Sequence, residues 1–214
     1  MKTLLIYAVD YCYGYASFLK TKFRVKFTDN PYHANIVLFP GGADVSPSLY
    51  EAKQHHTTYC DIEKDVQHFN LFESVKCNKD ILKLGICRGS QLLCVANGGK
   101  LIQNVNNHMG MHNMIDKEGN IFPITSTHHQ MAFPFNLLSS EYEIMAWAEP
   151  KLSTIYEGDK INIDKLEEDI FKEPEITYYP ITNSLGIQGH PELLEIGCET
   201  NKYLCNIINS LISL

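Results

Sequence analysis

The chain has 214 residues, 44% of them hydrophobic and 20% charged, which is the composition of an ordinary globular protein. A formal net charge of −7 and the lack of any Lys/Arg-rich run argue against binding to nucleic acid. No apolar run approaches the ~18 residues that a membrane-spanning helix needs, and no export signal is recognisable. We therefore expect a cytoplasmic protein that binds a small molecule or a peptide-like compound, and neither nucleic acid nor a membrane.

Seven cysteines are many for a chain of this length. An odd number without paired spacings, in a chain with no export signal, favours free thiols over a disulfide framework. No Cys-x-x-Cys motif is present, which argues against a zinc knuckle. Six of the cysteines are expected to be small buried residues, and only Cys87 is expected to act chemically.

The first half of the chain alternates apolar strands with helices, a pattern that predicts an α/β fold around a largely parallel sheet. The strand at residues 81–86 is continuously apolar, as strands inside a parallel sheet are. The helix after it is expected to stop at the glycine pair at residues 98–99, a typical C-terminal cap. In all, strands are expected over residues 3–9, 34–39 and 81–86, and helices over residues 15–22, 61–77 and 90–96.

The second half is less regular. Residues 100–120, rich in Asn, His and Met, are predicted as loop, and the acidic residues 157–173 as an exposed excursion. Strands are predicted over residues 142–148 and 175–188, the second broken by a turn at residues 180–184. Residues 192–214 are predicted as a closing helix with an inner face of Ile196, Tyr203, Leu204, Ile207, Ile208 and Leu211. Because no repeat or linker divides the chain, we predict one domain over residues 1–214.

The strongest local motif is Gly85-Ile-Cys87-Arg88-Gly89, which lies between a predicted strand and a predicted helix. This G-x-C-x-G form is typical of a nucleophile elbow, whose flanking glycines permit a tight, strained turn. At a helix N-terminus, the macrodipole and free N–H groups favour a thiolate on Cys87 and, through the Arg88 amide above all, can stabilise an oxyanion. The five residues alone are equally compatible with an ordinary strand-to-helix turn around a buried cysteine.

A second motif, Gly189-His190-Pro191-Glu192, follows the last predicted strand. Pro191 fixes its own φ and restricts His190 to an extended conformation, so one rigid turn presents the His190 and Glu192 side chains together. Glu192 can then accept a hydrogen bond from one imidazole nitrogen while the other faces a thiol, as nucleophilic catalysis by cysteine requires. Together with the elbow, this motif predicts a triad of Cys87, His190 and Glu192.

Gly-Ile-Cys-Arg-Gly-Ser-Gln at residues 85–91 and Gly-Ile-Gln-Gly-His-Pro-Glu at residues 186–192 together resemble the class I glutamine amidotransferase superfamily. Residues 38–50 resemble the oxyanion loop of its γ-glutamyl hydrolase branch, which includes the γ-glutamyl-γ-aminobutyrate hydrolases. Residues 96–103 resemble the segment after the nucleophile helix in that branch, and residues 126–130 resemble its substrate-pocket loop. These segments follow the order of the family and span nearly the whole chain.

The resemblance implies a flavodoxin-like three-layer α/β sandwich and hydrolysis through a γ-glutamyl thioester on Cys87, with no cofactor. It implies that Gly41 or Gly42 lends a second backbone donor to the oxyanion, and the glycine run leaves open which of the two. It also implies a pocket for the glutamyl group that is lined by Gln91 and by the backbone of His129, Gln130 and Met131.

Several residues depart from the family pattern. Gly189 stands where an aromatic residue usually precedes His-Pro-Glu, which would leave that wall of the pocket more open. The acidic-Gly-x-Ile-Glu segment of the family is not recognisable at residues 152–157, and His68 stands where Glu is expected. These departures bear on substrate specificity and leave the triad intact.

Two histidine pairs, His108 with His112 and His55 with His56, have the spacing to be weighed as metal ligands. No nearby Cys or carboxylate in the sequence completes either set, so we expect no metal and interpret these histidines as pocket-lining groups. Arg88 could contact an acidic part of the substrate, but a salt bridge that anchors the elbow is the favoured interpretation.

Three functions are compatible with the sequence. The favoured one is a stand-alone hydrolase that opens the γ-glutamyl amide bond of an amine or short peptide. The second is a glutaminase module that delivers ammonia to a synthase, which would be a separate subunit because no synthase domain is recognisable here. The third is an inactive binding protein of the same fold, against which the intact Cys87, His190 and Glu192 argue.

Overall fold

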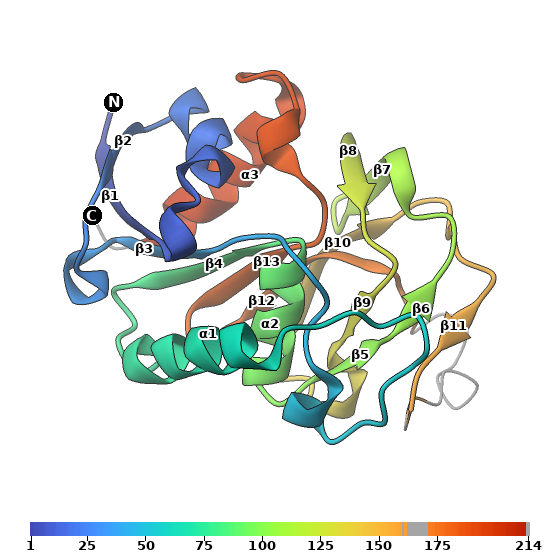
Figure 1. The fold of residues 1–214 in the computed structure, drawn as a ribbon. Coiled ribbons are helices and arrows are strands. Elements are labelled where there is room, and N and C mark those ends of the chain that lie inside the picture. Colours follow the sequence, from blue (N-terminus) through green and yellow to red (C-terminus); the bar gives the residue numbers. More distant parts are fainter. Residues whose placement is uncertain (160, 162–170, 213–214) are drawn as a thin grey trace.

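The computed structural model describes residues 1–159, 161 and 171–212 of the chain. A large sheet runs through the molecule in the order β2-β1-β3-β4-β13-β12-β10-β7-β8 (Figure 1). Its strands are β1 (Thr3–Ala8), β2 (Arg24–Phe27), β3 (Ile36–Phe39), β4 (Leu82–Ile86), β7 (Met109–Asp116), β8 (Ile121–Thr127), β10 (Glu143–Ala148), β12 (Pro174–Tyr179) and β13 (Ser184–Ile187). Two small sheets pair β5 (Lys100–Ile102) with β9 (Met131–Phe133), and β6 (Asn104–Val105) with β11 (Tyr156–Glu157).

The central sheet has a parallel part and an antiparallel extension. Strands β2, β1, β3, β4 and β13 are parallel to one another. From β13 onward, each described strand pairs antiparallel with its neighbour as far as the β7–β8 hairpin. The predicted α/β fold around a mostly parallel sheet is therefore confirmed, and the antiparallel extension is the part that the sequence did not reveal.

Helices cover both faces of the parallel part (Figure 1). Helices α1 (Ile62–Val75) and α2 (Arg88–Ala96) lie on one face, and α3 (Glu199–Leu211) lies on the other with the 3₁₀ segment η2 (Tyr13–Thr21). In β3, Val37 and Phe39 pack into the core beneath α1 and α2, whereas Ile36 and Leu38 pack into the core beneath α3. A strand buried on both faces needs apolar residues at every position, which explains the continuous apolar runs. The shorter 3₁₀ segments are η1 (Val9–Tyr11), η3 (Pro31–His33), η4 (Pro47–Tyr50), η5 (Pro134–Asn136) and η7 (Pro191–Leu193).

The prediction of a loop over residues 100–120 is wrong, because this stretch contains β5, β6 and the eight-residue β7. Strand β7 includes Gly110, His112 and Asn113, and Ile115 is its single β-branched residue, the type that usually marks a strand. It is stabilised by pairing with β8 on one side and β10 on the other. Strand β2 also escaped prediction, since it lies at the sheet edge with three of its four residues exposed.

The closing helix begins at Glu199 and not at residue 192. Gly197 adopts a φ of 89°, which is incompatible with continuing a helix, and the thiol of Cys198 caps α3 by accepting a hydrogen bond from the Asn201 amide at 3.5 Å. Ile196 therefore lies outside the helix and is 53% exposed. The remaining inner-face prediction holds, with Leu204, Ile207 and Ile208 buried and Tyr203 and Leu211 packed against the same core.

Three smaller predictions can be compared with the structure. Most of the acidic excursion at residues 157–173 lies outside the described residues, but Glu173 at its end is buried and not exposed. All seven cysteines are free thiols, as predicted. The expectation that six of them are small buried residues is wrong, because Cys77 is exposed and Cys12, Cys60 and Cys198 are only partly buried.

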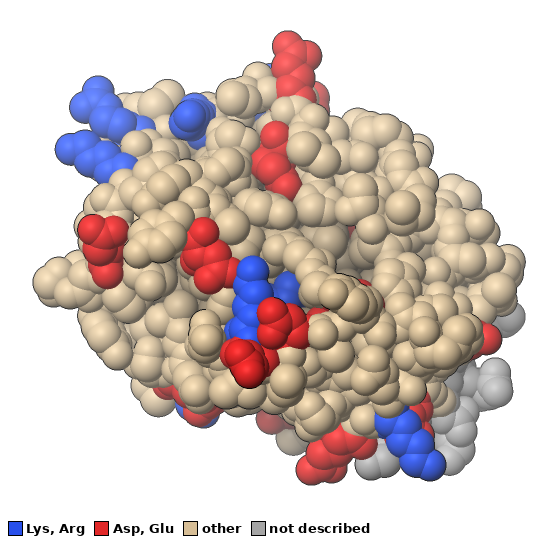
Figure 2. Space-filling view, in the orientation of Figure 1, with Lys and Arg blue, Asp and Glu red and all other residues tan. Residues whose placement is uncertain are grey.

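The described part of the chain contains no helix with both the length and the apolar content to traverse a bilayer. Figure 2 shows Lys and Arg side chains in small, separate groups on the visible face, with Asp and Glu side chains between them. That face therefore carries no continuous basic stripe of the kind that follows a nucleic-acid backbone.

Candidate active site

The predicted elbow is present at the junction of β4 and α2. Cys87 has a φ of 53° and a ψ of −110°, a conformation that non-glycine residues rarely adopt. Its amide donates a hydrogen bond to the Ile187 carbonyl at 2.8 Å, which ties the turn to the neighbouring strand β13. Such strain persists only where the surrounding structure imposes it, and it is common at reactive residues.

Backbone crowding explains the glycine spacing around Cys87. A Cβ on Gly85 would lie 2.4 Å from the carbonyl group of Gly89, and a Cβ on Gly89 would lie 2.1 Å from the Phe39 carbonyl oxygen. A Cβ on Gly186 would lie 2.4 Å from the Ser90 hydroxyl. Each contact is shorter than real Cβ atoms show, so α2 can approach β3, β4 and β13 this closely only because these positions are glycine.

His190 reaches the elbow because β13 runs parallel to β4, with Ile187 paired to Ile86. Its backbone amide donates to the Thr125 carbonyl at 2.7 Å. The ring Nδ1 lies 2.7 Å from Glu192 Oε1, and Nε2 lies 3.1 Å from the Thr127 hydroxyl. Proline at the turn thus places His190 and Glu192 together, as their spacing predicted.

The neighbouring charged groups have a larger effect on the pKa of His190 than its burial has. Burial lowers the pKa of this imidazole, but hydrogen bonding and charge interactions with Cys87 and Glu192 raise the pKa to about 10. The imidazolium is therefore the stable form at neutral pH, and the group facing it is the Cys87 sulfur. This arrangement can hold a thiolate–imidazolium pair, the reactive form of a cysteine nucleophile.

Arg88, directly after Cys87, is almost fully buried and forms an ion pair with Asp65 on α1. Its Nη1 lies 2.7 Å from His68 Nδ1, whose other ring nitrogen lies 3.0 Å from Asp10 Oδ2. Burial and the neighbouring guanidinium lower the pKa of His68. Because an arginine nitrogen can only donate, His68 Nδ1 accepts from Arg88, and its Nε2 donates to Asp10. The favoured interpretation of Arg88 as an anchor of the elbow is confirmed, and His68 is part of that anchor.

Asp65 also reaches the loop after β3. Its Oδ2 accepts hydrogen bonds from the Ser46 amide at 2.7 Å and the Ser46 hydroxyl at 2.5 Å. The loop that contains Gly41 and Gly42 is thereby tied to the same carboxylate as Arg88. A Cβ on Gly41 would lie 2.8 Å from the Tyr15 hydroxyl and 3.3 Å from His190 Cε1, so this backbone passes directly beside the imidazole.

A cavity of about 380 Å³ opens in front of Cys87. Asp44 Oδ2 lies on its wall, 3.1 Å from His129 Nε2 and 2.9 Å from the Tyr59 amide. The hydrogen bond and charge of Asp44 raise the pKa of His129. The lining residues are Tyr15, Gly42, Ala43, Asp44, Tyr59, Cys87, Arg88, Gln91, Thr127, His128, His129, Gln130 and His190.

The remaining predicted pocket residues are divided between the wall and the layer behind it. Gln91 donates to the Gln130 carbonyl at 2.9 Å, which connects α2 to the loop after β8. Met131 is fully buried in β9 and does not line the cavity, and neither does Gly41. Thr127 and Asp44 also line the cavity, and they lie within the segments at residues 126–130 and 38–50 that resemble the family. Nothing in the sequence indicated that Tyr15 would line it.

The expected opening at Gly189 is absent. A Cβ there would lie 2.3 Å from Ile124 Cγ1 and 2.9 Å from the Thr125 carbonyl oxygen, both in β8. The space that an aromatic side chain would take is filled by the β7–β8 hairpin. The expectation of a more open wall is therefore wrong.

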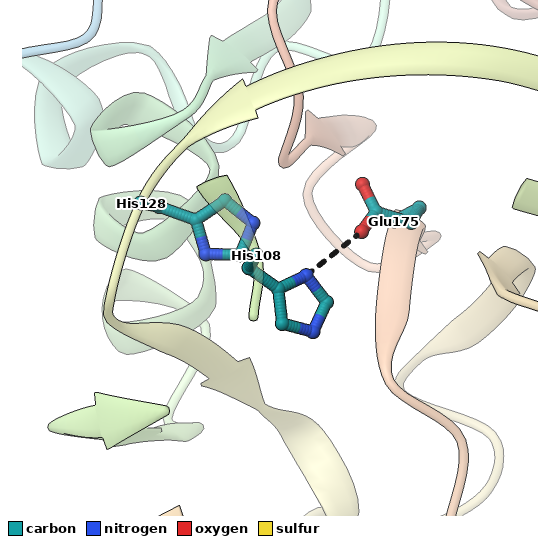
Figure 3. A group of neighbouring side chains, drawn as sticks. All are labelled: His108, His128 and Glu175. Atoms are coloured by element: carbon teal, nitrogen blue, oxygen red, sulfur yellow. Dashed lines mark ion pairs between the residues drawn. The ribbon is translucent and has the colours of Figure 1, made fainter. Parts of the chain in front are cut away.

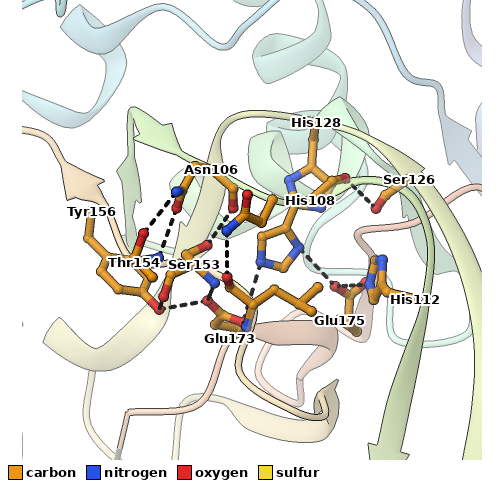
Figure 4. A network of polar contacts seen from close by, with 12 residues as sticks. Asn106, His108, His112, Ser126, His128, Ser153, Thr154, Tyr156, Glu173 and Glu175 are labelled. Carbon is orange, nitrogen blue, oxygen red and sulfur yellow. Dashed lines mark hydrogen bonds and ion pairs between the residues drawn. The ribbon is translucent and has the colours of Figure 1, made fainter.

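The expectation that no carboxylate joins His108 and His112 as a candidate ligand is also wrong. Glu173 and Glu175, distant in the sequence, lie beside these histidines at the start of β12 (Figure 4). His112 Nε2 lies 2.9 Å from Glu175 Oε1. Neither histidine lines the cavity in front of Cys87, so they are not pocket-lining groups.

Comparison with known proteins gives a family and several relatives. The Peptidase C26 family matches residues 32–137. Protein NtpR of Enterococcus hirae is 26% identical over 183 residues, which cover 78% of this chain and 71% of that protein.

Solved structures share the fold at low sequence identity. A protein from Thermoplasma acidophilum described as a putative subunit of GMP synthase is 15% identical, with a TM-score of 0.62 over 99% of this chain and 95% of that one. PurLQS from Thermotoga maritima is 16% identical, with a TM-score of 0.60 over 99% and 100%. A glutamine amidotransferase from Thermotoga maritima is 13% identical, with a TM-score of 0.54 over 99% and 95%.

Proposed function

Because residues 32–137 match the Peptidase C26 family and the fold is shared with a glutamine amidotransferase, we propose that the chain hydrolyses γ-glutamyl amide bonds through a covalent intermediate on Cys87. The Peptidase C26 match supports an amide hydrolase or glutaminase of the cysteine type. The observation that carries the finer proposal is the facing pair of Cys87 and His190 at the floor of a polar cavity, with Glu192 2.7 Å behind the imidazole.

In the proposed reaction, the Cys87 thiolate attacks the γ-carbonyl carbon, and the carbonyl oxygen becomes an oxyanion. The Arg88 amide at the start of α2 and an amide of Gly41 or Gly42 stabilise that charge. His190 gives its proton to the leaving amine as the C–N bond breaks, which leaves a γ-glutamyl thioester. His190 then takes a proton from water, whose oxygen attacks the thioester and releases glutamate and the thiolate. Glu192 orients the imidazole throughout.

The charges on the cavity wall support a glutamyl group as the substrate. Its α-ammonium and α-carboxylate groups carry one charge of each sign. Asp44 offers a carboxylate, and the His129 imidazole beside it, whose pKa the Asp44 hydrogen bond raises, offers a partner for a carboxylate on the same wall. A substrate head with both charges matches this pair better than an apolar acyl group does.

A panel of γ-glutamyl amides with free glutamine, incubated with the pure chain and analysed for products, tests the proposal. We expect glutamate and the free amine from at least one member, and much slower release from the matching glutaryl amide, which lacks the α-amino group. Equal rates on glutaryl and γ-glutamyl amides would contradict recognition of the glutamyl head. Hydrolysis of none of them would contradict the stand-alone hydrolase.

A glutaminase that supplies ammonia to a separate synthase subunit is the second candidate. It is supported by relatives of the fold whose names include PurLQS and part of a GMP synthase. Such a chain would be nearly silent alone, so robust hydrolysis by the pure protein would argue against it.

An inactive binding protein of the same fold is the third candidate. A glutamine-like chloroketone separates it from both enzymes, because an active elbow becomes labelled at Cys87 in one-to-one stoichiometry. The Cys87→Ala variant should take up no label. Absence of label on the wild-type chain would favour the inactive protein.

A further inference from the structure

A second polar cluster lies at the cavity wall and is buried against the antiparallel part of the sheet. His108 precedes β7, His128 follows β8, and Glu175 belongs to β12 (Figure 3). All three side chains are buried, with exposed fractions of 4% or less. One donor atom of each lies within 4.8 Å of the donor atoms of the other two. None of these residues has a part in the proposed reaction.

Each of the three side chains is contacted from behind at one of its two polar atoms. His128 Nδ1 donates to the Gln130 carbonyl at 2.8 Å. His108 Nε2 faces Glu173 Oε2 at 3.4 Å, and Glu175 Oε1 accepts from His112 Nε2 at 2.9 Å (Figure 4). Glu173 is itself fixed by the amides of residues 152 and 153 and by the Tyr156 hydroxyl.

The other polar atom of each side chain makes no hydrogen bond to a described residue, although His108 Nδ1 lies 3.6 Å from Glu175 Oε1. His108 Nδ1, His128 Nε2 and Glu175 Oε2 are all buried and make no hydrogen bond in the described part of the chain. Since His128 donates from Nδ1, its Nε2 presents a lone pair, and Glu175 Oε2 presents another. Two buried acceptors that converge without a donor are costly unless a cation lies between them.

We propose that His108 Nδ1, His128 Nε2 and Glu175 Oε2 bind one divalent transition-metal ion, with Zn²⁺ as the best match. Two imidazoles and one carboxylate form a ligand set that zinc accepts in tetrahedral coordination, with a fourth position for water or another oxygen. Bonds of ~2.1 Å would bring the ligand atoms to ~3.4 Å from one another. The three side chains would therefore close in by small rotations. The partners behind them match the outer contacts that orient metal ligands.

A protonated His108 is the alternative way to balance the two glutamates. Its two ring nitrogens lie 3.4 Å from Glu173 and 3.6 Å from Glu175. A ring that is protonated on both nitrogens could therefore donate to both carboxylates. That arrangement leaves the lone pair of His128 Nε2 without a donor, whereas a metal ion satisfies all three open atoms together. This difference favours the metal.

The ion would join three segments that are far apart in the sequence. His128 also lines the cavity in front of Cys87, and its neighbours His129 and Gln130 do so as well. A metal behind His128 would therefore fix the wall of the cavity without touching the reacting atoms. The inference rests on the cluster alone and is independent of the reaction proposed for Cys87.

Metal content tests the inference directly. Tag-free protein, stripped with a chelator and dialysed against Zn²⁺, should retain one zinc per chain, and added Zn²⁺ should raise the thermal midpoint of the stripped protein. The near-isosteric Glu175→Gln variant should bind Zn²⁺ at least ~100-fold more weakly. The matched control His56→Ala, an exposed histidine, should bind like the wild type. Failure of stripped, folded wild-type protein to bind Zn²⁺ would overturn the proposal, as would equal binding by Glu175→Gln.

Cobalt provides a second measurement, because the free cysteines offer an alternative metal site. Stripped protein loaded with Co²⁺ should show the visible d–d bands of a four-coordinate ion with nitrogen and oxygen ligands. A strong thiolate-to-cobalt charge-transfer band would place the metal on cysteine and contradict the assignment. Loss of the d–d bands in His128→Ala, with the circular dichroism spectrum unchanged, would support it.

Discussion

The two sides of the cavity each bury a histidine near a carboxylate, yet they give the ring opposite properties. At the elbow, Cys87 and Glu192 overcome burial and raise the pKa of His190 to about 10. In the wall, burial beside His108 lowers the pKa of His128 to about 3. His190 Nδ1 faces a carboxylate, whereas His128 Nδ1 faces a neutral carbonyl. Burial disfavours the charged ring in both places, so the hydrogen-bond partner decides whether the ring holds a proton or offers a lone pair.

The largest expected difference is in kcat between the variants that remove the His190 ring and the His128 ring. His190→Ala should lower kcat by ~10³-fold or more on the best substrate of the panel, by analogy with other triads. His128→Ala should leave a far larger share of the activity, since its ring does not face Cys87 in the proposed reaction. Steady-state kinetics on variants with unchanged circular dichroism measure both. A loss below tenfold for His190→Ala would show that another group is the base.

Breaking the ion pair behind the elbow should affect stability most. Asp65→Asn leaves the Arg88 guanidinium buried without its carboxylate, a change that typically costs ~3–5 kcal/mol. Urea unfolding monitored by fluorescence measures the loss. Asp10→Asn, at the exposed end of the same chain of contacts, should cost no more than ~1 kcal/mol. Similar losses for the two variants would contradict the anchoring role of Asp65.

The segment that carries His190 packs against strand β8 at Gly189, and this contact can be tested by substitution. Gly189→Ala forces a Cβ against Ile124 and the Thr125 carbonyl, which should destabilise the protein by ~1–3 kcal/mol and displace the adjacent His190. Gly14→Ala is a matched control, because a Cβ at Gly14 meets no atom within 4 Å. Thermal unfolding and kcat/KM should fall together for Gly189→Ala and stay near wild type for the control. If thermal unfolding and kcat/KM of Gly189→Ala stay at wild-type values, strand β8 can move aside at little cost, and the close contact is not important.

The smallest expected effect is a shift in pH dependence. The folded-state pKa of His190 is raised, so its charged form stabilises the protein fully below about pH 6.5, and that contribution disappears as the pH rises toward 10. In Glu192→Gln the imidazolium loses its carboxylate partner. The pH at which kcat/KM falls on the alkaline side of its pH profile should therefore decrease by ~1 pH unit. Glu195→Gln, a change at an exposed glutamate, should leave that pH unchanged. An unchanged alkaline side of the profile in Glu192→Gln would contradict the charge coupling.

The elbow could be predicted from the sequence because its causes are local. Gly85, Cys87 and Gly89 lie in one turn, and Pro191 fixes the geometry between His190 and Glu192 within three residues. Their roles in catalysis stay a prediction. Which of Gly41 and Gly42 donates to an oxyanion is likewise open to experiment, although Gly42 is the one that lines the cavity.

The cluster of His108, His128 and Glu175 could not be predicted, because the contacts that assemble it are long-range. His108 and Glu175 meet only after β10 has paired with both β7 and β12. Strand β7 forms through that pairing, and its polar sequence resembles a loop. The same pairing brings Glu173 and Glu175 to histidines that are far from them in the sequence. Local patterns therefore identified the elbow and the loop at residues 126–130, and missed the buried cluster that lies beside that loop.

The contact between Gly89 and Phe39 has a consequence for protein engineering. Because α2 rests directly on the backbone of β3 at this point, main-chain atoms alone set the spacing between the nucleophile and the glycine loop that follows β3. Side chains such as Asp44, Tyr59 and His129 can then be exchanged to accept other acyl groups without moving the attacking sulfur. A combinatorial library confined to those three positions would sample substrate preference on an unchanged backbone, whereas a library that includes Gly89 would mostly yield unfolded chains.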